Sequence, residues 1–257
     1  MNRSIIFTVV GFTTFFFILY FGCDVRTHEK NQPQAVRDKV PDSVDFDNLI
    51  AVATAKLNDT LRLRIQNLTQ SAKASPQPTT LKLLSSTWHD AGNDEIAAHY
   101  AEAIADAEKT DAAWSVAGGN FYLAAQKNNA EPELHKYCLQ HAADAFQNAA
   151  SIKPDKWEYR LNMALCYTEN PPQDNPMKGI LLLRDLDKEH PENVSININL
   201  ARLAIKTGQF DKAVARLEKI LPQNAGDKKI ICLLADAYTG KNDPKAAVYA
   251  KKCRERN

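Results

Sequence analysis

The chain has 257 residues, and 32 Lys and Arg against 31 Asp and Glu give it a formal net charge of +1, which excludes the broad positive field of a nucleic-acid-binding surface. Glycine is scarce at nine residues, and neither G-x-G-x-x-G nor G-x-x-x-x-G-K-[ST] occurs, so the common phosphate-binding loops are absent. Because 44% of the residues are hydrophobic, the composition excludes a wholly disordered chain and favours one large domain or a repeat array.

The first predicted element is an apolar run at the N-terminus. Residues 5–22 read IIFTVVGFTTFFFILYFG and contain six of the ten Phe residues. As a helix this run would be about 27 Å long, which is enough for the core of a bilayer. Arg3 precedes it, and no acidic residue occurs before Asp24. Hydropathy and the positive-inside rule predict that residues 1–23 attach the chain to a membrane and send the remainder across it.

Two forms of this attachment are open. The segment is either an uncleaved signal anchor or a lipoprotein signal, in which Cys23 becomes the lipidated first residue after cleavage. Gly22 before Cys23 fits a lipoprotein, but Tyr20 and Phe21 fit it poorly because cleavage sites prefer small residues. The anchor is the favoured form. Residues 24–43 are polar, lack aromatic side chains and contain two Pro, which predicts a flexible tether.

Residues 44–75 form the next predicted element, which is helical. Its apolar residues follow one helical face, and Asn58-Asp59-Thr60 favours a break into two helices over one long helix. Pro76 and Pro78 end the segment. The residues of the apolar face are Phe46, Leu49, Ile50, Ala53, Leu57, Leu61, Ile65, Leu68 and Ala72.

The rest of the chain, residues 78–257, carries an internal repeat of 34 residues, interrupted by insertions before Ala142 and around Pro171. The predicted units are 78–110, 111–156, 157–193, 194–227 and 228–257. Small residues recur at the eighth and twentieth positions, where two helices of a hairpin would cross closely. The eighth positions are Ser85, Gly118, Ala164, Ala201 and Ala235. The twentieth positions are Ala97, Ala142, Gly179, Ala213 and Ala247.

This pattern resembles the tetratricopeptide repeat (TPR) family over residues 78–257. The resemblance implies an all-α solenoid of stacked helix hairpins, because one hairpin cannot bury its apolar face alone. The stretches 176–180 and 208–213 also resemble small membrane-anchored TPR proteins of bacterial envelopes, which implies a bacterial membrane protein with its repeats in the periplasm. Arg160 and Asn197 depart from the family pattern because they place polar groups at the fourth position.

The resemblance further implies a concave groove, lined by the first helix of each hairpin, that binds peptides or protein surfaces. The candidate groove residues are Lys82, Ser86, His89, Tyr122, Asn162, Asn199, Arg202, Lys206 and Asp236. Amides among them suit a peptide backbone, and the cations suit acidic groups. A solvated polar face is the alternative interpretation. The two-carboxylate clamp of some TPR proteins is rejected, because Lys82 matches its first motif position but Ser86 does not match the next.

The Cys and His residues are the remaining candidates for chemistry. His135-x-x-Cys138-x-x-His141 has ligand-like spacing, but on a straight helix the two His residues would lie about 9 Å apart along the axis, so no metal site is predicted. An exported chain permits disulfides. The favoured expectation is nevertheless that the cysteines after Cys23 pack as small hydrophobic free thiols: Cys138, Cys166, Cys232 and Cys253.

The predicted function is therefore a membrane-tethered, non-enzymatic scaffold that binds an unidentified protein or peptide. No nucleophile motif such as G-x-S-x-G occurs, and no cofactor, metal, nucleic acid or small-molecule substrate is expected. The alternative is an envelope redox or metal-dependent accessory protein that uses the Cys and His residues, although the absence of C-x-x-C weakens it.

Overall fold

The computed structural model describes residues 44–127 and 131–255, which form twelve α-helices, one short 3₁₀ turn and no strand. The first helices of five hairpins are α4 (Pro78–Asp90), α6 (Asp111–Ala125), α8 (Trp157–Glu169), α10 (Val194–Lys206) and α12 (Lys228–Gly240). The second helices are α5 (Asp94–Glu108), α7 (Pro132–Ile152), α9 (Lys178–Glu189), α11 (Phe210–Ile220) and α13 (Lys245–Glu255). The hairpins are preceded by α2 (Phe46–Ala55) and α3 (Asp59–Ala74), and η1 (Pro222–Asn224) joins α11 to α12.

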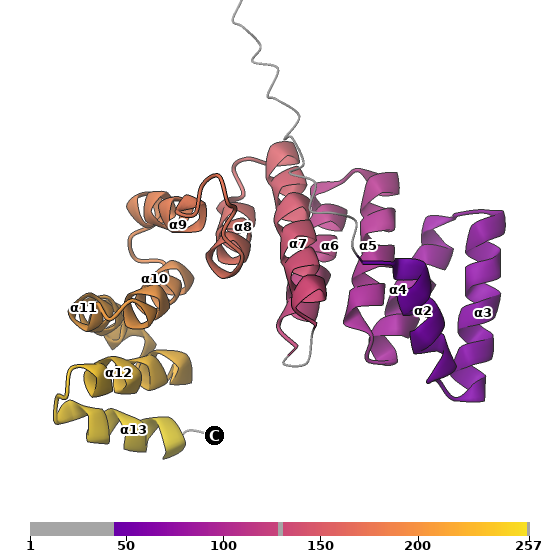
Figure 1. Ribbon diagram of the computed structural model, residues 1–257. Coiled ribbons are helices and arrows are strands. Elements are labelled where there is room, and N and C mark those ends of the chain that lie inside the picture. Colours follow the sequence, from indigo (N-terminus) through magenta and orange to yellow (C-terminus); the bar gives the residue numbers. More distant parts are fainter. Residues whose placement is uncertain (1–43, 128–130, 256–257) are drawn as a thin grey trace, which may run out of the picture. The chain divides into compact units, whose positions relative to one another are not determined.

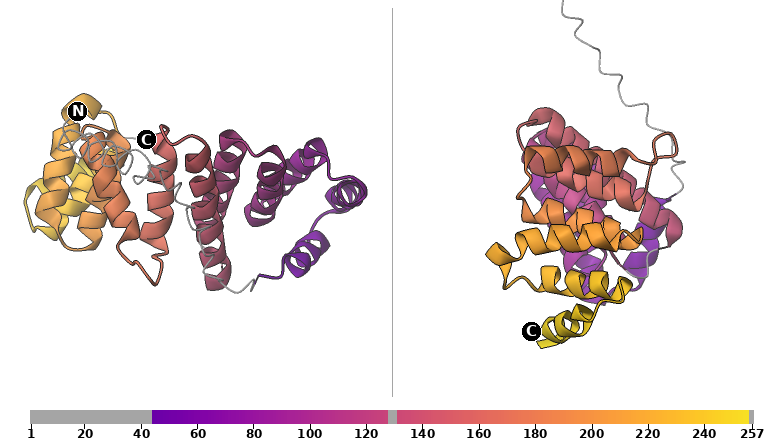
Figure 2. Two further views of the ribbon diagram at one scale, coloured as in Figure 1. Left: turned by 90° about the horizontal axis from the view of Figure 1, so that it is seen from above. Right: turned by 90° about the vertical axis from the view of Figure 1, so that its left-hand side faces the viewer.

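The predicted all-α class is confirmed, and hairpins that follow one another in the sequence are neighbours in space (Figure 1). In the left view of Figure 2 the hairpins follow one another in chain order, from purple through magenta and orange to yellow, and the indigo helix α2 lies beside them. This is the stacking expected of a repeat in which each unit covers the next.

The predicted membrane anchor at residues 1–23, with its candidate lipidation site Cys23, lies outside the described residues, as does the predicted tether at 24–43. Within 44–127 and 131–255, no helix has the length and hydropathy to cross a bilayer. The prediction of membrane attachment therefore rests on the sequence of residues 1–23.

Polar side chains cap the helices where the sequence changes pattern. The break expected within 44–75 is confirmed, because the Asn58 side chain caps α3 and accepts a hydrogen bond from the backbone N–H of Leu61 at 2.9 Å. Thr110 and Asn193 cap α6 and α10 in the same way, with N–H to oxygen distances of 3.1 Å. These caps satisfy backbone donors that a helix end leaves unpaired.

Three hairpins turn through a left-handed residue at the same repeat position. Gly92, Gly208 and Asn242 have φ angles of +79°, +71° and +55°. Glycine has no Cβ to clash in this conformation, and Asn tolerates it better than most residues do. The shared turn returns the chain so that the second helix of each of these hairpins lies against the first.

Small residues let the paired helices approach to backbone contact. A Cβ added to Gly179 would lie 2.7 Å from the backbone nitrogen of Thr168 and 2.8 Å from the carbonyl oxygen of Ala164, so α9 leaves no space for a side chain where it crosses α8. Ala201 and Ala213, the corresponding pair in the next hairpin, are fully buried in one apolar cluster. Close packing at these positions is the physical reason for the small-residue repeat.

The last hairpin departs from this pattern. Ala247 is exposed and Ala246 packs against the core cluster instead, so the predicted small-residue crossing at Ala247 is wrong. No residue of α13 is buried. A disulfide between Cys232 and Cys253, with Cα atoms 5.0 Å apart, joins α12 to α13. The expectation of free thiols is therefore wrong for these two residues, and the covalent link adds to the packing of Ala246 and Tyr249 against the core cluster.

The polar departures at the fourth repeat position are accommodated by hydrogen bonds. The buried Asn197 amide donates to the carbonyl oxygen of Pro191 at 2.9 Å, and its own oxygen accepts from Arg216 at 3.2 Å. Arg216 also holds Asp187 through two bonds of 2.9 and 2.8 Å. Arg160 makes a similar two-bond ion pair with a carboxylate of α9. These pairs connect adjacent helices where an apolar residue would otherwise pack.

The helix α2 docks on the second helices of the first two hairpins, which the sequence did not predict. Phe46 stacks on His99 of α5 with ring centroids 4.6 Å apart, and its centroid is 5.3 Å from that of Tyr137 of α7. His141 in turn stacks on Tyr137 at 3.9 Å, and its Nδ1 lies 2.9 Å from Glu102 Oε1. Docked α2 thus covers a cluster of aromatic and titratable groups.

Acid should weaken this docking. Burial lowers the pKa of His99, although the Glu102 and Asp47 carboxylates raise it, and a charged His141 would lower it further. Because docking lowers the pKa of His99, the undocked state binds a proton more readily than the docked state. The docked state is therefore most stable above the ordinary histidine pKa of about 6.5 and becomes less stable as the pH falls below it. We expect amide hydrogen exchange in α2 to be faster at about pH 5.5 than at about pH 7.5, after correction for the intrinsic exchange rates. Exchange in α12 serves as the internal reference.

The control is His99→Gln, which should remove most of this pH dependence because Gln does not titrate in this range. Equal corrected exchange in wild-type α2 at both pH values would contradict the assignment.

The helix crossing predicts the effect of enlarging its small residues. Ala201→Leu adds three carbon atoms at a fully buried crossing, and overpacking of this kind costs typically about 1–3 kcal/mol. We expect a clearly lower thermal midpoint by circular dichroism. Ala215→Leu, on the exposed side of α11, is the matched control and should leave the midpoint nearly unchanged. Equal midpoints for the two variants would refute the crossing.

Candidate interaction groove

The first helices of successive hairpins line a row of three cavities, which we call the inner groove. A cavity of about 430 Å³ lies between α4 and α6, one of about 150 Å³ between α6 and α8, and one of about 150 Å³ between α8 and α10. The second and third cavities share Tyr122 and Leu165, so they adjoin. Side chains of α5, α7 and α9 form the floors, which is why stacked hairpins create such a row.

The first cavity contains three predicted groove residues: Lys82, Ser86 and His89. Two of them are already engaged. Lys82 Nζ lies 2.7 Å from Glu108, which lines the same cavity, and His89 Nδ1 lies 2.6 Å from Asp94. The Lys82 charge is therefore balanced within the chain, and the His89 ring already has a carboxylate partner.

The second cavity is open because of a glycine. Gly119 lines it with Tyr122, Asn162, Leu165 and Phe146, and a Cβ added to Gly119 would meet no atom within 4 Å. The fold therefore does not require glycine at this position, in contrast to the crossing in α9. Asn162, one of the candidate groove residues, is half-buried here.

The third cavity holds the predicted cationic residues. Asn199, Arg202 and Lys206 lie at spacings of three and four on α10, and all three line the cavity. Neither Arg202 nor Lys206 forms an ion pair with any residue of 44–127 or 131–255, whereas outward cations such as Arg216 do. Asn199 donates its own amide to the Ser195 carbonyl at 2.8 Å, so its side-chain oxygen is the group left to bind a ligand.

A carboxylate stands at the boundary of the second and third cavities. Glu169 accepts hydrogen bonds from the Tyr122 hydroxyl at 2.6 Å and from Gln126 at 2.7 Å. Burial raises the pKa of Tyr122 well above its usual range, and the bond to Glu169 adds to this, while Arg202 opposes it from the other wall. The tyrosine is thus a neutral donor that orients Glu169 across the groove.

The structure brings eight of the nine candidate residues to the inner groove. Asp236 is exposed on α12 and lines none of the three cavities. Sequence reasoning missed Phe146 and Glu169, which contribute to the floor and the boundary. The Phe146 ring lies against the backbone of α6, where a Cβ added to Gly118 would be 3.0 Å from it, and this placement depends on the tertiary packing.

The two His residues of α7 contact different groups within the chain. His135 Nδ1 lies 2.9 Å from the carbonyl oxygen of Ala125, whereas His141 faces Glu102. In the described part of the chain no group of three side chains could hold a metal ion.

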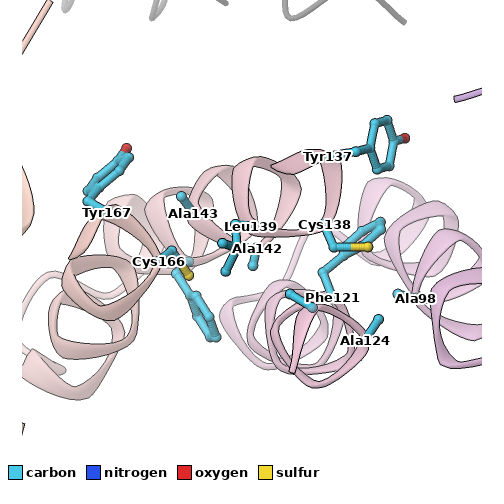
Figure 3. Packing of buried hydrophobic residues seen from close by; sticks show 12 residues of the cluster. Ala98, Phe121, Ala124, Tyr137, Cys138, Leu139, Ala142, Ala143, Cys166 and Tyr167 are labelled. Atoms are coloured by element: carbon cyan, nitrogen blue, oxygen red, sulfur yellow. The ribbon is translucent and has the colours of Figure 1, made fainter. Parts of the chain in front are cut away.

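The expectation of free thiols is confirmed for Cys138 and Cys166, which are buried in the cluster drawn in Figure 3. Burial raises the pKa of the Cys138 thiol to about 12 and that of Cys166 further. Such thiols are poor nucleophiles and metal ligands.

Replacement of Gly119 and of Gly179 by alanine should change the free energy of unfolding in opposite directions. Gly119→Ala adds a methyl group in open space and removes a helix-destabilising residue, so we expect about 0.5–1 kcal/mol of added stability. Gly179→Ala places its methyl group against backbone and should cost about 1–3 kcal/mol. Chemical denaturation of the two variants measures both effects, and a loss of stability in Gly119→Ala would show that this cavity is not open.

Comparison with known proteins agrees with this architecture. The sequence profile of the tetratricopeptide repeat family matches residues 175–237, which include α9, α10 and α11. A search of curated protein sequences finds no match.

The fold is similar to solved structures at low sequence identity. A tetratricopeptide repeat protein from Parabacteroides merdae is 12% identical, with a TM-score of 0.57 over 82% of this chain and 80% of that chain. The thermophilic TPR protein TTC0263 from Thermus thermophilus is 20% identical, with a TM-score of 0.50 over 75% of this chain and 98% of that chain. The profile match shows tetratricopeptide repeat sequence within residues 175–237, and the stacked hairpins of the described residues have the fold of these tetratricopeptide repeat proteins.

Proposed function

We propose that this protein is a membrane-tethered scaffold that holds a peptide segment or protein surface in its inner groove. The observation that carries the proposal is the row of three cavities along α4, α6, α8 and α10, lined by eight residues at the positions where the family resemblance implies ligand contact. The tetratricopeptide fold itself supports a role in protein–protein interaction, because the stack presents an extended surface that no single hairpin has.

The proposed location is outside the cytoplasm, with the repeats in a bacterial periplasm. Two observations support it. Residues 5–22 are uncharged and long enough to span a bilayer as a helix. The disulfide between Cys232 and Cys253 fits an oxidising compartment, since cytosolic proteins seldom keep such bonds.

The proposed binding role is tested by site-specific photo-crosslinking in cells. A photo-reactive residue at Asn162, inside the groove, should give discrete crosslinked products, and the same residue at Arg184, on the exposed side of α9, should give none of them. Gly119→Leu fills the adjacent cavity and should reduce the Asn162 products several-fold without unfolding the chain. Products that are equal at both sites, or that persist with Gly119→Leu, would contradict groove binding.

The proposed attachment is tested by fractionation. The full chain should sediment with membranes, and a chain that lacks residues 1–23 should be released, because the apolar run would be gone. Labelling with a radioactive fatty acid separates the two forms: a lipoprotein takes up the label and loses it in Cys23→Ser, whereas an uncleaved anchor takes up none. Recovery of the full chain as a soluble protein would contradict attachment.

A further inference from the structure

The side chains that line the inner groove differ between its two ends. At its first cavity the exposed apolar side chain of Val116, 58% accessible, lies with Ile104 in the lining. The charge of Lys82 is neutralised there by Glu108. Leu83, on the same helix as Lys82, is also largely exposed. This end therefore offers apolar surface and no unbalanced cation.

The other end of the groove is cationic. Arg202 and Lys206 are exposed, lie four residues apart on α10 and make no ion pair with any described residue. Like charges at this spacing on a helix repel each other. The nearby Glu169 carboxylate is bonded to Tyr122 and Gln126 rather than to either cation. A ligand that brought an acidic group to α10 would relieve the repulsion and complete the hydrogen bonding of the Arg202 guanidinium.

We propose that the inner groove selects a protein segment that carries an apolar cluster and an acidic cluster in series. The apolar side chains lie against α4 and α6, and the acidic side chains lie against Arg202 and Lys206 of α10. The open cavity at Gly119 receives a side chain between the two clusters. This inference rests on the binding function proposed above and adds the chemistry and the register of the partner.

Arg202 and Lys206 differ from cations that form ion pairs within the stack. Two cations of the outward helix α11 are paired with carboxylates: Arg216 with Asp187, and Lys219 with Glu192. These ion pairs connect neighbouring elements of the stack. The two cations of α10 that face the groove have no such structural partner among the described residues, so the partner segment supplies it.

The test selects binders to the full chain in detergent micelles from a phage-displayed library of random 12-residue peptides. Enriched peptides should combine acidic and apolar clusters. Their affinity should fall about tenfold or more in Arg202→Ala/Lys206→Ala, as expected for the loss of charged hydrogen bonds. Selection against Arg202→Glu/Lys206→Glu should enrich basic peptides instead. Arg184→Ala, an exposed cation of α9, is the matched control and should bind as wild type does.

A photo-reactive residue in the apolar cluster of a selected peptide should crosslink to α4 or α6, and one in the acidic cluster to α10. Three outcomes distinguish the hypotheses. Acidic–apolar binders that need Arg202 and Lys206 support the inference. Binders that Gly119→Leu blocks, but that lack acidic enrichment and ignore the two cations, overturn the inference and leave the groove function standing. The absence of binders, or binders that Gly119→Leu does not affect, overturns both.

Discussion

The close crossing of two helices within each hairpin is the constraint on which the rest of this structure depends. At Gly179 the backbone of α9 meets that of α8 with no room for a side chain, and the corresponding residues of the next hairpin, Ala201 and Ala213, are fully buried in one apolar cluster. Larger residues would separate the helices and tilt the hairpin. Because each hairpin packs on the next, a change in one crossing would alter the stacking of its neighbours.

The inner groove follows from this geometry. Stacked crossings place the first helices side by side, and their exposed positions meet over a floor formed by the second helices. Gly119 shows that the groove is distinct from the core: its neighbour Gly118 faces the Phe146 ring, whereas an added Cβ at Gly119 would meet nothing. The fold therefore requires a small residue at one position and leaves the next one free to serve a ligand.

The sequence predicted the features that repeat. Ala201 stands where small residues recur, so the spacing assigns it to the crossing, whereas the resemblance to the tetratricopeptide repeat family assigns Arg202 to the groove. Features that occur once and depend on tertiary placement were missed. The disulfide of Cys232 requires a partner from another helix, and the docking of Phe46 on α5 and α7 joins segments that no periodicity relates. Glu169 was missed although it is the thirteenth residue of its unit, as Lys206 is of the next unit, so the repeat itself could have placed it in the groove.

The central claim is that a partner segment lies in the inner groove with its acidic end on α10. A crystal structure of the chain with a selected 12-residue peptide tests it most directly. The account predicts peptide density along α4, α6, α8 and α10, with a carboxylate within hydrogen-bond distance of Arg202 and apolar side chains near Val116. Density on the outer surface of α5, α7 or α9, or a peptide in the groove with its acidic residues away from Arg202 and Lys206, would contradict it.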